Sequence, residues 1–105
     1  MQRGDVVRFK VPKGVGREQQ GERFGIVVQS DVMLPRSVVV VAPTSRSAKP
    51  ASFRPEVDIA GDVTRVLVEQ LGAVDVQRLG RRVGRLTAEE MWAVDEALVV
   101  VLGLD

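Results

Sequence analysis

Four consecutive valines lie near the middle of the chain, in the stretch Ser37–Pro43, which reads SVVVVAP. A second apolar run, Phe24–Gln29 (FGIVVQ), precedes it. Both runs are short and rich in β-branched residues, which favours a strand, with a buried helix as the alternative for each. Because neither run alternates apolar with polar residues, we expect two strands that are buried on both faces at the centre of a sheet.

Shorter strand-like segments surround these two runs. Val7, Phe9 and Val11 alternate with Arg8 and Lys10, which predicts a strand with one buried face and one basic face. Gly, Pro, Ser and Asp separate the apolar runs, a pattern typical of an all-β barrel or sandwich over the first 85 or so residues. Further strands are expected at Ser52–Val57, Arg65–Gly72 and Arg81–Arg85.

The last segment of the chain changes to a helical period. Thr87 and Glu90 have the spacing of a capping box, and Leu86 and Met91 that of the hydrophobic staple beside it. Gly103 suits the position just past a helix end. We therefore expect a C-terminal helix of about four turns that packs on the barrel. Its apolar face is formed by Met91, Val94, Leu98, Val101 and Leu102.

The composition excludes much of enzyme chemistry. The chain has 105 residues, which predicts one domain, residues 1–105. It has no Cys and no His, so disulfides, thiolate nucleophiles, imidazole catalysis and Cys/His zinc sites are absent. The carboxylates form no metal-binding pattern, and we expect neither a metal nor a cofactor. No apolar run approaches the roughly 18 residues of a membrane span, so the protein is expected to be soluble and cytoplasmic.

Positive charge gathers in the first half of the chain. Residues 1–54 carry ten Arg or Lys against four Asp or Glu, whereas residues 55–105 carry five against ten. Arginine supplies 12 of the 15 cations, and its planar guanidinium binds phosphate through two hydrogen bonds. This asymmetry indicates a surface for a polyanion, with an ordinary solvated surface as the alternative reading. The glycine-rich loop Pro12–Glu22 lacks the Gly-Lys-Ser/Thr ending of a nucleotide-binding loop.

Phosphoryl transfer on RNA is a reaction that these residue types can support. A fixed guanidinium can stabilise developing charge on a phosphate, and RNA carries its own nucleophile, the ribose 2′-OH. The sequence also resembles the MazF/PemK toxin family along nearly its whole length. The segments that carry this resemblance are Arg3–Val7, Gly16–Arg23, Ile26–Asp31, Val40–Ser45, Val68–Gln70, Arg78–Leu86 and the helical segments Glu90–Met91 and Val94–Leu98.

The resemblance implies an SH3-like barrel, mainly β with a C-terminal α-helix. It also implies a homodimeric, metal-independent endoribonuclease toxin that cleaves single-stranded RNA and is neutralised by a small acidic antitoxin. The implied reaction is attack of the ribose 2′-OH on the adjacent phosphate, which leaves a 2′,3′-cyclic phosphate and a 5′-OH.

The resemblance also assigns site residues. Arg23 matches the catalytic arginine of the family, and Thr44 matches its active hydroxyl. Two positions depart from the family pattern: Phe24 stands where many members have Pro, and Arg17 where some have His. Glu18 and Glu69 are the candidates for the general base, and each has pairing with an arginine as its alternative role. Substrate binding is assigned to Arg17, Glu18, Gln19, Gln20, Ser45 and Glu69.

Two readings from other functional classes remain beside the nuclease. One is a toxin on the same fold that resembles the CcdB gyrase poisons and acts by gripping a partner without chemistry, because a fold does not determine function. The other is an RNA-binding barrel without activity, which the small number of aromatic residues disfavours, since such barrels stack bases on aromatic rings.

Overall fold

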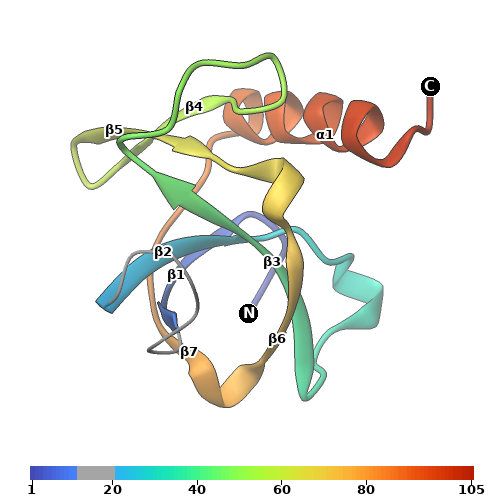
Figure 1. Cartoon of the computed structure of the whole chain (residues 1–105). Coiled ribbons are helices and arrows are strands. Elements are labelled where there is room, and N and C mark those ends of the chain that lie inside the picture. Colours follow the sequence, from blue (N-terminus) through green and yellow to red (C-terminus); the bar gives the residue numbers. More distant parts are fainter. Residues whose placement is uncertain (12–20) are drawn as a thin grey trace.

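The computed structural model describes the backbone of residues 1–11 and 21–105 and the side chains of residues 1–8 and 23–105 (Figure 1). The predicted site residues of the long loop, Arg17 to Gln20, therefore lie outside the described residues. The described elements are β1 (Asp5–Val11), β2 (Gly21–Val27), η1 (Asp31–Met33), β3 (Val38–Ser45), β4 (Glu56–Ile59), β5 (Asp62–Val66), η2 (Val68–Gln70), β6 (Gly72–Asp75), η3 (Val76–Arg78), β7 (Leu79–Arg85) and α1 (Ala88–Leu102).

The strands form an antiparallel sheet in the order β4-β5-β3-β2-β1-β7, with β6 also paired to β3. Strand β3 has three partners along its length. Residues 38–41 pair with β6, residues 41–43 with β2 and residues 44–45 with β5. The sheet curls around this strand into a half-barrel, and α1 lies across one end of it (Figure 1). The mainly β class with a C-terminal helix is confirmed.

The two central apolar runs are buried on both faces, as predicted. Ile26 and Ala42 belong to the larger cluster of buried residues, which also contains Val94 of α1. Val27 and Val41 belong to a second cluster on the opposite face of the sheet. Alternate residues of one strand point to opposite faces, so each run contributes to both clusters.

Strand β1 departs from the prediction of one buried face and one basic face. Val6 and Val7 are both buried, and they belong to different clusters. The guanidinium of Arg8, on the same face as Val6, lies 5.5 Å from the ring centre of Phe24, and Arg8 is half-buried. At Val6 and Arg8, the second face of β1 is therefore covered by the larger cluster and by Phe24 instead of facing solvent, whereas the side chain of Lys10 lies outside the described residues.

Two of the expected strands have the wrong boundaries. The segment Ser52–Val57 forms a turn first, and β4 begins at Glu56. The expected strand Arg65–Gly72 is interrupted: β5 ends at Val66, and η2 follows it. The amide of Leu67 donates to the carbonyl of Pro43 at 2.8 Å, which ties the end of β5 to β3 before the chain turns away. A bond to a distant strand leaves no local signal in the sequence.

The turn between β4 and β5 also escaped the sequence analysis. Ala60 and Gly61 have φ angles of 54° and 88°, so both central residues of this two-residue turn are left-handed. Such turns match the twist of a hairpin, but they normally carry Asn or Asp before the Gly. Here Asp58 supplies support from the strand, because its carboxylate accepts a hydrogen bond from the Gly61 amide at 2.9 Å. Because Ala60 takes the first position, the sequence lacks the Asn-Gly or Asp-Gly pair that predicts such a turn.

The C-terminal helix begins and ends where the sequence predicts. The Thr87 hydroxyl accepts from the Glu90 amide at 3.1 Å, and the Glu90 carboxylate accepts from the Thr87 amide at 2.9 Å. Gly103 ends the helix with a left-handed φ of 68°. The second oxygen of Glu90 accepts from the Asp58 amide at 2.8 Å, so the same side chain also joins α1 to β4. No helix within residues 1–11 and 21–105 has the length and apolarity needed to span a membrane.

The N-terminus closes the half-barrel through the buried carboxylate of Asp5, which is 3 % exposed. This carboxylate accepts from the Gln2 amide at 2.8 Å, and it pairs with Arg82 at 3.1 Å and Arg85 at 3.0 Å, both on β7. A buried carboxylate with several charged and amide donors is compensated for its lost hydration. Asp5 thus fixes β7 against β1 at the edge of the sheet.

Replacing Asp5 with Asn is expected to lower the free energy of unfolding by about 1.5 to 3 kcal/mol, because hydrogen bonds to a charged group contribute about that much. Urea unfolding followed by circular dichroism measures the change. Asp105→Asn, at the exposed C-terminus, is the matched control and should stay within about 0.5 kcal/mol of wild type. Equal urea midpoints for the Asp5 variant and wild type would show that this carboxylate does not hold β7.

Candidate functional site

Arg23 and Thr44 lie together where β2 and β3 separate. The two strands pair through residues 25–27 and 41–43, and Thr44 then pairs with Val66 of β5. Arg23, two residues before the paired segment of β2, reaches across the gap, and its Nη2 donates to the Thr44 carbonyl at 3.1 Å. The pairing of β2 with β3 ends at this point, and a cation and a hydroxyl lie together there.

The Thr44 side chain is buried and has a fixed orientation. It is 5 % exposed, and its hydroxyl donates to the Phe24 carbonyl at 3.2 Å. Because the hydroxyl proton is used in this bond, the lone pairs of the Thr44 oxygen are left to accept. Thr44 therefore presents an acceptor, and not a donor, to any ligand at this position.

Arg23 is held at one end and has an unused donor at the other. Its Nη2 is bound to Thr44, whereas its buried Nε has no hydrogen-bond partner among the described residues. A buried N–H without an acceptor costs about 1 to 3 kcal/mol. The guanidinium thus keeps donors for a ligand oxygen, since one plane of guanidinium donors can serve two acceptors.

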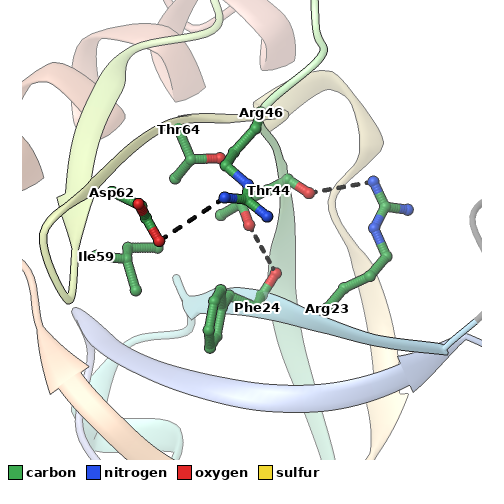
Figure 2. Close-up of a pocket in the computed structure, with 7 residues that line it drawn as sticks. All are labelled: Arg23, Phe24, Thr44, Arg46, Ile59, Asp62 and Thr64. Carbon is green, nitrogen blue, oxygen red and sulfur yellow. Dashed lines mark hydrogen bonds and ion pairs between the residues drawn. The ribbon is translucent and has the colours of Figure 1, made fainter.

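A cavity of about 140 Å³ adjoins these two residues (Figure 2). Figure 2 shows Arg46 in front of Thr44, with Asp62 beside it and Arg23 on the opposite side of Thr44. Arg46 and Asp62 form an ion pair of 3.7 Å and are each about 70 % exposed, so they make the rim of the cavity. The cavity is lined by Arg23, Phe24, Thr44, Arg46, Ile59, Asp62 and Thr64.

Several of these lining residues were missed by the sequence analysis. Arg46 could have been found, because it follows Thr44 and Ser45 directly in the chain. Asp62 and Thr64 had no such signal, since they reach the cavity through the pairing of β5 with β3. Ile59 reaches it from the neighbouring strand β4.

The structure separates the other predicted residues from this cavity. The Ser45 hydroxyl lies 3.2 Å from that of Ser47, and Ser45 does not line the cavity. Glu69, expected on a strand, lies on η2. One of its oxygens accepts from Nε and Nη2 of Arg54, at 2.8 and 2.6 Å, which corresponds to the arginine-pairing role left open for Glu69. Of the predicted residues whose side chains are described, Arg23 and Thr44 line the cavity and Ser45 and Glu69 do not.

Among the side chains that the structure describes, those of residues 1–8 and 23–105, no group of acidic, His or Cys residues could hold a metal ion. The chemistry on offer at the cavity is therefore that of two guanidiniums, two threonine hydroxyls and one carboxylate. Guanidiniums bind phosphate or carboxylate oxygens, and the Thr44 oxygen accepts from a hydroxyl or an amine. A phosphodiester with a neighbouring hydroxyl matches this set of groups.

Comparison with known proteins identifies relatives of this chain. Residues 2–102 match the family model of the PemK-like, MazF-like toxins of type II toxin–antitoxin systems. The chain is 34 % identical to endoribonuclease EndoA of Bacillus subtilis over 99 % of its length and 96 % of that protein. It is 32 % identical to endoribonuclease MazF9 of Mycobacterium tuberculosis over 99 % of its length and 98 % of the relative.

Solved structures share the fold. A mycobacterial endoribonuclease in complex with its cognate antitoxin superimposes with a TM-score of 0.85 at 18 % identity, covering 100 % of this chain and 97 % of that chain. MazF from Deinococcus radiodurans superimposes with a TM-score of 0.78 at 21 % identity, covering 98 % of this chain and 96 % of that one.

Because both Arg54 and Glu69 are about three-quarters buried, Glu69→Gln is expected to lower the free energy of unfolding by about 1.5 kcal/mol, the lower end for a charge-assisted hydrogen bond. Urea unfolding measures this change in the free energy of unfolding. Asp105→Asn, at an exposed position, also removes one carboxylate charge and should have little effect. An unfolding curve for the Glu69 variant that overlays wild type would mean that the Arg54 pair contributes nothing to stability.

Proposed function

Because the chain belongs to the PemK/MazF family of toxins of type II toxin–antitoxin systems, we propose that it is an endoribonuclease toxin that cleaves single-stranded RNA without a metal. Its partners are single-stranded RNA, including mRNA in the cytoplasm, and a small acidic antitoxin that neutralises it. The observation that carries this proposal is that Arg23 of β2 and Thr44 of β3 contact each other and line one cavity. The names of two relatives, both endoribonucleases, support it.

The proposed reaction uses the RNA's own nucleophile. The ribose 2′-oxygen attacks the adjacent phosphorus, the bond from phosphorus to the 5′-oxygen of the next nucleotide breaks, and a 2′,3′-cyclic phosphate and a 5′-OH result. The proton of the 2′-OH leaves to a base, and the 5′-oxygen gains one. Negative charge grows on the phosphate oxygens at the transition state, so a fixed cation accelerates the reaction.

Arg23 is proposed to stabilise this charge. Its guanidinium is held by the Thr44 carbonyl through Nη2, which fixes its plane before the substrate arrives. Only Nη2 has a partner among the described residues, so the guanidinium keeps donors for a phosphate oxygen. A donor that is fixed in advance needs no reorganisation during the reaction, which is the basis of its catalytic effect.

Thr44 is proposed to orient the nucleophile. Because its proton is donated to the Phe24 carbonyl, the Thr44 oxygen can accept from the ribose 2′-OH and cannot donate to a phosphate. A threonine hydroxyl of ordinary pKa is a poor base, so this contact positions the 2′-OH and does not deprotonate it.

The base is proposed to be Glu18, since Glu69 is engaged by Arg54 and does not line the cavity. The other residues of the loop, Arg17, Gln19 and Gln20, are proposed to bind the substrate, as the resemblance to the family implies. Ser45 keeps a proposed role in substrate binding through its place next to Thr44 on β3.

The experiment that tests the function uses the purified protein and a long RNA of mixed sequence, incubated in EDTA. We expect cuts at defined sites. The new 5′ ends should accept phosphate from polynucleotide kinase without prior dephosphorylation, and mass spectrometry should find 2′,3′-cyclic phosphate on the 3′ ends. Intact RNA, together with toxicity in cells, would favour the CcdB-like alternative, in which the toxin acts by binding a partner.

In this assay Arg23→Ala is expected to reduce the cleavage rate by about 10² to 10³-fold, the usual cost of one preorganised oxyanion donor. Arg23→Lys should restore little, because lysine lacks the planar fork. The control is Arg36→Ala, at an exposed position between η1 and β3, which should act weakly and less so at high salt. Matched circular dichroism spectra exclude unfolding. Cleavage by Arg23→Ala within about threefold of wild type would contradict the proposed role.

A homodimer is proposed as the active form. Large apolar side chains are exposed on α1 and just after it, among them Trp92 at 65 %, Val100 at 56 % and Leu104 at 70 %. Exposed apolar surface of this kind marks a protein interface. Sedimentation equilibrium at micromolar concentration should give twice the mass of one chain, and a monomeric mass there would contradict the proposal.

A further inference from the structure

The cavity beside Arg23 and Thr44 has the size of a single six-membered ring. Its volume is about 140 Å³, and an engineered protein cavity of about 150 Å³ accommodates benzene. A pyrimidine base is one such ring, whereas a purine is two fused rings. Arg23 and Thr44, which are proposed to bind the phosphate and the 2′-OH, line this cavity. A base that enters it therefore belongs to a nucleotide at the cut site.

The walls of the cavity suit the faces of a base. Ile59 is 4 % exposed and closes one wall, and Phe24 provides an aromatic ring nearby (Figure 2). Unstacked RNA bases are held in protein pockets by aromatic and apolar side chains against their faces and by hydrogen bonds at their edges. Buried walls of this kind supply the first contact but do not distinguish one pyrimidine from the other.

The rim of the cavity supplies polar groups of both types. The Asp62 carboxylate accepts hydrogen bonds and cannot donate, and the Arg46 guanidinium donates and cannot accept. They lie 3.7 Å apart, so one base edge can meet both. Thr64, which is 6 % exposed, adds a hydroxyl deeper in the cavity.

The pairing edge of cytosine matches this rim. Cytosine presents an amino donor at N4 beside two acceptors, N3 and O2, and a carboxylate is a recognised acceptor for N4–H. Uracil has a single donor on this edge, N3–H, between two acceptors, O4 and O2. If N3–H donates to Asp62 and one acceptor meets Arg46, the other acceptor lies beside the Asp62 oxygens and is repelled, which does not happen with cytosine. We propose that this cavity selects a cytosine next to the scissile phosphate, with Asp62 accepting from N4 and Arg46 donating to N3 or O2.

The ion pair at the rim does not oppose this binding. Arg46 is 73 % and Asp62 69 % exposed, and their separation is long for a salt bridge. Exposed pairs of this kind contribute little to stability, so both side chains can turn to a base at little cost. In the free protein the pair keeps the two groups together at the rim and leaves neither charge buried.

The test replaces the Asp62 carboxylate with an amide. The amide side chain introduced by Asp62→Asn presents both an N–H donor for O4 and an oxygen acceptor for N3–H of uracil, so this variant should change the preferred base. The substrate is a set of RNAs in which the nucleotides flanking the mapped cut are randomised, and sequencing of the cut ends gives the preference. Wild type should prefer cytosine over uracil at one flanking position by about tenfold, and Asp62→Asn should abolish or reverse that preference.

Controls separate specificity from general damage. Asp105→Asn, at an exposed position, makes the same chemical change and should keep the wild-type base preference. Arg46→Met should lower the cytosine preference without exchanging it for uracil, because it removes a donor and adds no acceptor. An unchanged base profile for Asp62→Asn, or a purine preferred at both flanking positions by wild type, overturns the inference.

A binding measurement makes the inference independent of cleavage, since it otherwise rests on the proposed function. Short oligonucleotides of deoxycytidine and deoxyuridine lack the 2′-OH and stay intact, and fluorescence anisotropy measures their affinity. Wild type should bind the cytosine oligomer about tenfold more tightly, and Asp62→Asn should not. If wild type cuts no RNA but shows this difference, the endoribonuclease proposal fails and the base pocket stands; equal affinity for the two oligomers overturns the pocket.

Discussion

Strand β3 pairs with three other strands although a strand has only two edges. Its partners must therefore pair with different residues along its length, and the fold follows from this constraint. Its first residues pair with β6, its middle residues with β2 and its last two with β5. The curled sheet has an apolar cluster on each face, and α1 packs on one of them. Pairing with β2 ends at Pro43, and the cavity lies beside the next residue, Thr44, where β3 is paired with β5 on its other edge. The barrel and the candidate site therefore both depend on how β3 is paired.

Ion pairs join the two halves of the chain, which carry opposite net charge in the sequence. Arg3 pairs with Asp95, Arg54 with Glu69 and Asp5 with two arginines of β7. Arg3 also donates through Nε to the Val28 carbonyl at 2.9 Å, so one side chain links the end of β2 to α1. Part of the basic character of the first half is therefore used within the fold. Arg36 and Arg46 keep most of their surface exposed to solvent.

The candidate site divides its polar groups between fixed and adjustable ones. Thr44 and Arg23 are held by backbone carbonyls, so their orientation is set before a substrate binds. Arg46 and Asp62 are held by each other at the surface and can change partners. Catalysis requires groups that do not reorganise, whereas recognition of a base tolerates side chains that adapt. This arrangement fits a catalytic role for Arg23 and Thr44 and a role in base recognition for Arg46 and Asp62.

The local features of this protein were determined by the sequence itself. The apolar runs of β2 and β3, the capping box at Thr87 and Glu90 and the helix end at Gly103 rest on interactions within a few residues, and such interactions leave a pattern that can be read directly. Arg23 and Thr44 were found through a resemblance to a family, because nothing in their neighbourhood distinguishes them. What only the tertiary structure decided depends on strand pairing between distant segments. The break after Val66, the pairing of Glu69 with Arg54 and the position of Asp62 beside Arg46 all depend on contacts between segments that no local pattern encodes.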